Sequence, residues 1–235
     1  MTLKEILIEL ENYGDEAIKK IYMNHGAKEP LYGVRIQDMK KIVKKVKKNH
    51  ELSLELYATG NSDAMYLAGL IADENKISKS DLNKWVKGAT NHGISEYTVA
   101  WVAAESKYGY KLGLQWIESS NELVATAGWS TLSNYAAITP DDKLDLKIYN
   151  KLLNRVEKNI HKAPNRVRYT MNGFVIAVGS YIIDLTEKAS QVAEKIGKVS
   201  VNVGGTSCKV PIAVDHIRKV KEKDKLGKKR KMARC

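Results

Sequence analysis

Apolar residues recur every three or four positions along nearly the whole chain, which is the spacing that places them on one face of an α-helix. The first helix is expected to begin at once, because Thr2 and Glu5 have the spacing of a capping box. The pattern thus indicates ten or more short helices joined by polar turns. After the first, they are predicted over residues 15–24, from 36 onward, and over 50–58, 62–73, 80–88, 94–107, 110–118, 121–136, 140–157, 165–181 and 184–196.

Small residues gather on one face of several of these helices, as at Ala64, Ala68, Gly69 and Ala72. Small side chains let neighbouring helices approach closely, so paired helices can stack in layers. The pattern favours an all-α fold, an α-α superhelix of HEAT-like repeats, that is, an α-solenoid. Because the repeat is degenerate, an irregular helical bundle stays open as the alternative. We expect residues 1–235 to form a single domain.

Residues 199–210 break the helical pattern. Apolar and polar side chains alternate on both sides of Gly204 and Gly205, a dipeptide that permits positive φ at both centres of a two-residue turn. In that register Val203 faces Thr206, and two further pairs follow on the same face. The segment is therefore predicted to be a short β-hairpin near the C-terminus. It is interpreted as a wedge or clamp for a nucleic-acid groove, with an insertion of no function as the alternative.

The chain is strongly basic, with 39 Lys and Arg against 27 Asp and Glu and a formal net charge of +12. Eleven basic residues and three acidic ones lie from Lys209 onward, mostly in a C-terminal tail over residues 217–235. Such an excess points to a polyanionic partner, most often a nucleic acid. A solubilising tail is the alternative for that run. For the lysines at positions 40–48, a solvated helix face and a phosphate-facing one are both open.

The sequence lacks the signatures of several other classes. No apolar run approaches 18 residues, so no membrane span is expected. Two cysteines rule out a disulfide framework and a four-cysteine metal site, and no P-loop or dinucleotide fingerprint appears. The histidines have no metal-ligand spacing, so neither a metal nor another cofactor is expected. The tryptophans are expected in the core: Trp85, Trp101, Trp116 and Trp129.

Three segments together resemble the AlkD-like DNA alkylation repair family. They are the run Leu31–Arg35 with the helix QDMKKIVKKVKK after it, the helix NSDAMYLAGLIAD, and the helix NRVRYTMNGFVIAVGSYI. The resemblance implies a curved stack of HEAT-like repeats with a positive concave face that cradles duplex DNA. It also implies a site at which active members excise positively charged alkylpurines, using a carboxylate, flanking tryptophans and an arginine.

The chain departs from that pattern where the family's catalytic residues are expected. Tyr97 falls at the position of the catalytic aspartate, with Glu96 beside it. The arginine position falls near Thr126, and one tryptophan position falls at Phe174. A phenol cannot replace a carboxylate that stabilises an oxocarbenium-like centre. The chain is therefore most similar to a branch of the family that lacks the catalytic residues, carries a β-hairpin and binds branched DNA.

Three functions follow from these observations. The first is a cytoplasmic, nucleoid-associated monomer that binds double-stranded or branched DNA with little regard to sequence and with weak or no base excision. The second is an active glycosylase that releases 3-methyladenine or 7-methylguanine, with Glu96 as its carboxylate and Tyr97 or Trp101 stacking. The third is a helical-repeat scaffold for a protein or an RNA. The candidate DNA contacts are Arg166, Arg168, Lys198, Asn202, Lys209, Arg218, Lys219 and Lys221.

Overall fold

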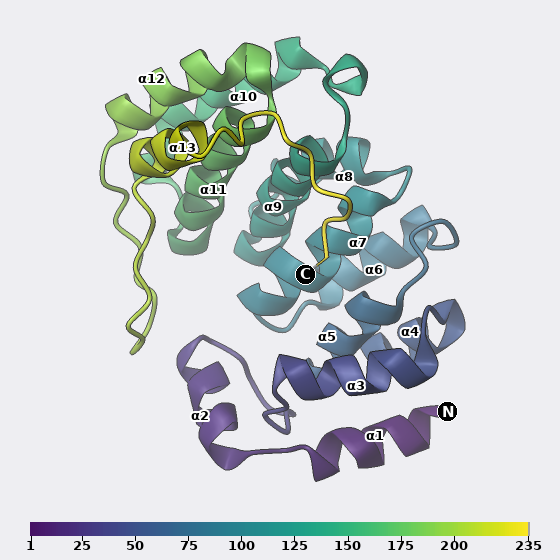
Figure 1. Cartoon of the computed structure of the whole chain (residues 1–235). Helices are drawn as coiled ribbons and strands as arrows, with labels where there is room; N and C mark the ends of the chain where they lie inside the picture. The colour runs from purple at the N-terminus through teal and green to yellow at the C-terminus, as the bar shows by residue number, and fades with distance from the viewer. Residues whose placement is uncertain (235) are drawn as a thin grey trace.

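The chain folds into a curved stack of helix pairs, as the computed structural model shows for residues 1–234 (Figure 1). Thirteen α-helices and four short π or 3₁₀ turns are present in this part of the chain. The α-helices are α1 (Leu3–Asn12), α2 (Glu16–Asn24), α3 (Ile36–Val46), α4 (His50–Ala58), α5 (Ser62–Ile71), α6 (Lys79–Gly88), α7 (Ala100–Glu105), α8 (Gly109–Trp116), α9 (Glu122–Ile138), α10 (Leu146–Asn159), α11 (Asn165–Tyr181), α12 (Thr186–Ile196) and α13 (Ala213–Glu222). The short turns are η1 (Ile94–Val99), η2 (Asp141–Lys143), η3 (Ile160–Lys162) and η4 (Ile183–Leu185). The prediction of an all-helical stack is confirmed.

The helices form two layers. Helices α4, α6, α8, α10 and α12 form an outer layer, and each is followed along the chain by its partner in an inner layer. The inner layer consists of α5, η1 with α7, α9, α11 and α13, which contact one another in that order. In each pair the chain passes along the outer helix and then returns along the inner one. All inner helices therefore run in the same direction.

The first turns of the inner helices lie in a row, which we call the N-terminal edge. Asparagines hold three of these starts, because the side-chain oxygens of Asn61, Asn91 and Asn121 accept backbone N–H groups of α5, η1 and α9. Neighbouring starts are joined directly as well. The Asn91 amide donates to Ser62 Oγ at 3.3 Å, and the Arg166 backbone N–H donates to Glu122 Oε1 at 2.6 Å.

The core divides into two large clusters, one in each half of the stack. The first is built mainly from α1 and α3 to α8, and the second mainly from α9 to α13 together with residues such as Val199 after α12. All four tryptophans are buried, which confirms the sequence expectation. Trp129 and Tyr149 pack against Phe174, with ring centroids 5.1 and 5.7 Å from it. The aromatic residues therefore hold the layers together.

The run Leu31–Arg35 has a structural explanation. The carboxylate of Asp63, at the start of α5, accepts the backbone N–H groups of Tyr32, Gly33 and Val34 at 2.6, 3.0 and 3.0 Å. Gly33 has φ of +82°, and a Cβ there would lie 2.5 Å from the Lys19 backbone nitrogen. Burial raises the pKa of Asp63, and the three N–H groups oppose that shift by stabilising the ionised form. This loop is thus fastened to the inner layer by a single buried side chain.

The predicted β-hairpin over residues 199–210 is wrong. No β-strand occurs within residues 1–234, and the segment is an extended loop, here called the arm, that projects from the end of α12 (Figure 1). Gly204 has the positive φ expected of a turn, at +74°. The Thr206 side chain occupies two backbone groups that the predicted ladder needs, because its Oγ1 donates to the Val203 carbonyl and accepts the Cys208 N–H. Asn165 accepts the N–H of Asn202 and donates to its carbonyl, which fixes one side of the arm to α11.

Two helix predictions also differ from the structure. Residues 140–145 form the short turn η2 and a connection, and α10 begins only at Leu146 because Asp145 caps it. The single helix predicted over 94–107 begins with six residues in the wider π-helical form before α7 starts. The tail predicted over 217–235 begins inside α13, and its residues up to 234 then return along the inner layer.

The buried carboxylate of Asp63 yields a prediction for stability. Asp63→Asn keeps the shape of the side chain but turns an NH₂ group or a weaker neutral acceptor toward three backbone donors. We expect it to lower the free energy of unfolding by about 2–3 kcal/mol, as measured by urea denaturation. The exposed variant Asp142→Asn serves as the control and is expected to stay within about 0.5 kcal/mol of the parent. Equal stability of both variants would contradict this role of Asp63.

Candidate nucleic-acid interface

The π-helical turn η1 turns two adjacent polar residues in opposite directions. Glu96 is buried, whereas Tyr97 is 44% exposed. A single π-helical turn is often found at functional sites, because the extra residue re-aims the side chains around it. Here it directs Glu96 into the inner layer and leaves Tyr97 on the surface, where its ring lies 5.4 Å from that of Trp101.

Glu96 forms a buried ion pair with Arg166, the second residue of α11. Its two carboxylate oxygens accept from Arg166 Nε at 2.9 Å and Nη2 at 2.6 Å. The side chains are 3% and 16% exposed, respectively. Burial raises the pKa of Glu96, and the guanidinium opposes that shift because it stabilises the charged form. The arginine also lies over the ring of Tyr169, 4.2 Å from its centroid.

His92 lies at the same edge, close enough to Arg166 for the arginine charge to affect its pKa. The side chain is partly buried. A Cβ at Gly26 would lie only 3.0 Å from its Cε1 atom, so the residues just before η1 and just after α2 are in close contact. Burial lowers the pKa of His92 to about 4, and the charges of Arg166 and His25 add to that shift. This imidazole is therefore neutral at physiological pH.

Two of the three positions at which catalytic residues are expected are closed, whereas the third, Tyr97, is exposed. Thr126 and Phe174 are both completely buried, so neither side chain is available to a ligand. Glu96 has both oxygens bound to Arg166, which prevents it from acting as a nucleophile or a base while the pair is intact. This arrangement can link η1 to α11, and it offers no prepared carboxylate for base excision.

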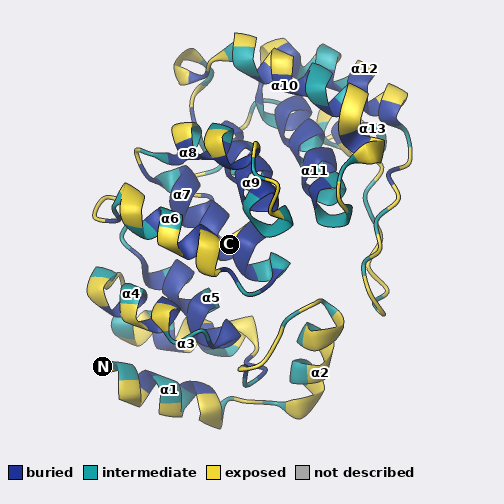
Figure 2. Cartoon of the chain, turned by 180° about the vertical axis from the view of Figure 1, so that it is seen from behind, coloured by how far each residue is buried: buried dark blue, intermediate teal, exposed yellow. Residues whose placement is uncertain are grey.

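The arm lies beside this site and spans the open side of the stack. It is fixed near its base by the Asn165–Asn202 hydrogen bonds, at 2.7 and 2.8 Å. Its tip approaches the other end of the chain, since a Cβ at Gly204 would lie 2.5 Å from the Asn24 carbonyl oxygen at the end of α2. Both views of the fold show the arm reaching toward α2 (Figures 1 and 2).

The predicted DNA contacts divide into two groups. Arg166, Arg168, Lys198, Asn202 and Lys209 lie at the start of α11 or in and next to the arm. The lysines in this group are exposed, whereas the half-buried Arg168 has an Nε atom that is buried with no hydrogen-bond partner. A guanidinium in that position lacks a counterion within residues 1–234 and suits a phosphate.

The second group, Arg218, Lys219 and Lys221, lies in the second half of α13. Lys219 and Lys221 are exposed, and Arg218 is paired with Asp215 and Glu222 on the same helix. Lys221 is eight residues beyond the start of α13, a distance of about 12 Å along the helix axis. The structure therefore does not bring the two groups into one compact site, although both belong to the inner layer.

The lysines at positions 40–48, in α3 and just after it, occupy more than one face. Lys41 pairs with Asp38, and Lys45 pairs with Glu9. Lys40 and Lys48 instead line a groove of about 520 Å³ together with Lys231 and Arg234 from the C-terminal segment. The groove lies away from the arm, on the side of the inner layer where α5 and α7 end.

Within residues 1–234 no cluster of metal-ligating side chains is present, and no helix in this part of the chain is long and apolar enough to cross a membrane. The sequence profile of the DNA alkylation repair enzyme family matches residues 6–191. The chain therefore belongs to that family.

Two curated proteins and one solved structure show the same relationship. The uncharacterized protein Lin0241 of Listeria innocua is 37% identical over 95% of this chain and 99% of its own length. The uncharacterized protein Lmo0209 of Listeria monocytogenes is 36% identical over 96% of this chain and 100% of its own length. The solved structure covers 100% of both chains with a TM-score of 0.91 and 39% identity. Its protein is described as one of a new family related to the HEAT-like repeat DNA glycosylases with affinity for branched DNA structures.

Sequence reasoning missed two features of this interface. The Glu96–Arg166 pair joins residues 70 positions apart, and no local pattern announces such a contact. The N-terminal edge did leave a signal in the sequence, because asparagines recur at positions 61, 91 and 121, at the starts of three of the five inner helices. That spacing marks the repeat more clearly than the small residues do.

The ion pair yields a prediction for stability. Glu96→Gln leaves the Arg166 charge buried without a partner, so we expect a loss of about 3–5 kcal/mol in the free energy of unfolding. The double variant Glu96→Gln/Arg166→Met is expected to lose less than that single variant. Glu118→Gln, which breaks the more exposed pair with Arg155, is the control and should cost at most about 1 kcal/mol. A cost for Glu96→Gln as small as that of the control would contradict the structural role of the pair.

The neutral His92 yields a prediction for pH dependence. As pH falls below the ordinary pKa of 6.5, the unfolded chain takes up a proton that the folded protein refuses until about pH 4. Stability is therefore lost between these values, by about 1–2 kcal/mol for this partly buried group. Urea denaturation from pH 7 to 4.5 should show a steeper decline for the parent than for His92→Gln. The exposed variant His216→Gln should follow the parent, and parallel curves for all three would contradict the assignment.

Proposed function

We propose that the protein binds DNA by its structure, with a preference for branched DNA, and does not excise bases. The observation that carries the proposal is the closed Glu96–Arg166 pair, which occupies the carboxylate next to the position at which the catalytic aspartate is expected. Tyr97, Thr126 and Phe174 stand where catalytic side chains are expected. The relative whose structure is solved is described as having affinity for branched DNA, which supports the same role here.

The N-terminal edge supports contact with phosphates. Each helix start carries a partial positive charge, and parallel inner helices align several such charges in one row. Arg168, Lys198 and Lys209 add full charges beside it, and none of the three has an ion pair within residues 1–234. Such contacts bind the DNA backbone without reading the bases, so little sequence preference is expected.

The arm supports a preference for branched rather than plain duplex DNA. It spans the space between α12 and α2 and so limits how a continuous duplex can approach the N-terminal edge. A fork or junction offers an opening between duplex segments in which an extended loop can lie. We also propose that the protein acts as a single-domain monomer associated with the nucleoid, as expected of a cation-rich protein that binds DNA without sequence preference.

A binding and release assay tests this proposal. The panel consists of a plain duplex, a fork, a four-way junction and an alkylated duplex at one salt concentration, with base release measured on the last. We expect tighter binding to the junction and no release of 3-methyladenine or 7-methylguanine. Release that is lost in Glu96→Gln would instead establish the glycosylase, and weak binding to every DNA would favour a protein or RNA scaffold.

Charge reversal tests the predicted contacts. Lys209→Glu in the arm and Lys219→Glu on α13 should each weaken junction binding about three- to tenfold and flatten its dependence on salt. Lys79→Glu makes the same charge change on the outer helix α6 and serves as the control. If both variants and the control bind alike, the arm and α13 do not contact DNA.

A further inference from the structure

The C-terminal segment 225–234, here called the strap, runs along the ends of four inner helices in turn (Figure 1). The Gly227 N–H donates to Ser180 O in the last turn of α11, at 2.9 Å. The Arg230 N–H then donates to Ala137 O near the end of α9, at 2.8 Å. Beyond them, the Ala233 N–H donates to Glu105 at the end of α7, at 2.7 Å. The last described residue, Arg234, reaches the end of α5.

These contacts supply hydrogen-bond donors and cations to the carbonyl groups at the ends of the inner helices. The last turn of a helix has carbonyl groups without a partner and a partial negative charge, which cations and N–H donors stabilise. Helices α5, α7, α9 and α11 have no basic residue in their own last turn. The strap supplies the missing cations from elsewhere in the chain. The Lys229 ammonium, for example, donates to the Ala136 carbonyl of α9 at 2.9 Å and pairs with Asp141.

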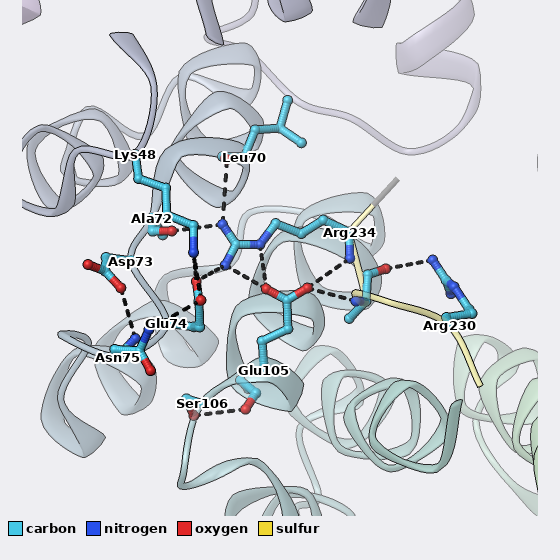
Figure 3. Close-up of polar contacts among 12 residues, drawn as sticks. Lys48, Leu70, Ala72, Asp73, Glu74, Asn75, Glu105, Ser106, Arg230 and Arg234 are labelled. Carbon is cyan, nitrogen blue, oxygen red and sulfur yellow. Dashed lines mark hydrogen bonds and ion pairs between the residues drawn. The ribbon is translucent and has the colours of Figure 1, made fainter. Parts of the chain in front are cut away.

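Arg234 is the anchor at the far end of the strap (Figure 3). Its side chain is only 7% exposed. Its guanidinium donates from Nε to Glu105 at 2.8 Å, from Nη1 to the Ala72 carbonyl at 2.7 Å, and from Nη2 to Glu74 at 2.7 Å. A planar guanidinium can satisfy this set of acceptors at once, whereas an ammonium cannot.

The strap joins parts of the chain that are otherwise connected only through intermediate layers. In a stack of repeats, each repeat contacts its neighbours, so stability is a sum of local terms. The Arg234 contacts instead span 129 to 164 residues of sequence. Ala233 also packs with Trp101 and Ala104 in a small apolar cluster separate from the two large ones. The strap therefore couples the two halves of the core.

We propose that the strap is a latch that fixes the spacing of the inner helices, and that Arg234 is its positioning residue. Fixed spacing of the helix ends on one side limits how far the helix starts can spread on the other, because the inner helices also pack against one another along their lengths. The latch thereby sets the distances between phosphate contacts along the N-terminal edge. This last consequence rests on the proposed DNA binding, whereas the latch itself does not.

The test compares Arg234→Gln with Lys225→Gln, which removes one charge from the strap at an exposed residue that has no ion pair within residues 1–234. Arg234→Gln is expected to lower the melting temperature by about 5–10 °C and to separate one unfolding transition into two. Amide hydrogen exchange at the ends of α5 and α7 should become at least tenfold faster. The milder variant Glu74→Gln keeps the Glu105 pair and should produce smaller shifts in the same direction, even if Arg234→Gln fails to fold. Because Glu74 also pairs with Lys48, Lys48→Gln is its control and is expected to leave both measurements unchanged.

A single transition and unchanged exchange in Arg234→Gln or Glu74→Gln, matching Lys225→Gln, would overturn the latch. Junction affinity is measured separately on the same variants. We expect Glu74→Gln to bind at least threefold more weakly than Lys225→Gln, although Glu74→Gln makes the protein more positive. If the parent protein binds no DNA but the exchange and unfolding effects appear, the proposed function fails and the latch stands. If the exchange and unfolding effects appear but Glu74→Gln and Lys225→Gln bind the junction equally well, the strap does not position the phosphate contacts, and that part of the proposal is overturned.

Discussion

The parallel alignment of the inner helices is the constraint on which the rest of the structure depends. Helix dipoles that point the same way place partial positive charge along one edge of the layer and partial negative charge along the other. Each edge also presents unpaired backbone groups. The unpaired backbone groups find their partners in different ways at the two edges. Asparagine side chains serve the helix starts locally, whereas the helix ends are served by one continuous basic segment from the C-terminus.

This division explains how a highly basic chain distributes its charge. The cations of the strap offset the negative edge and the acidic residues Glu74 and Glu105, so part of the C-terminal charge stabilises the fold. The arm and the start of α11 lie at the opposite edge, where cations and helix dipoles have the same sign. At that edge Arg168, Lys198 and Lys209 have no ion pair within residues 1–234, which suits the polyanion of the proposed function.

The sequence was a good guide wherever local chemistry decides the outcome. The capping box at Thr2 and Glu5 does begin the first helix, and the four tryptophans are buried as expected. Local chemistry misled at residues 199–210, because the alternation of apolar and polar residues does not show that the Thr206 hydroxyl binds the Val203 carbonyl and the Cys208 N–H. The anchoring of Arg234 was also beyond reach, since its partners lie more than 120 residues away and a run of lysines and arginines resembles a solvated tail.

In the proposed function, the Glu96–Arg166 pair places a carboxylate in an ordered contact rather than in a reactive one. A catalytic carboxylate has to remain available to its substrate, and an enzyme bears the cost in stability of leaving it without a full set of partners. In this chain Arg166 satisfies both oxygens and ties η1 to α11 across the site. The pair thereby engages the carboxylate and stiffens the N-terminal edge. A rigid, cationic edge beside a closed site is what recognition of DNA shape requires, because the contacts must already be in place when the DNA arrives.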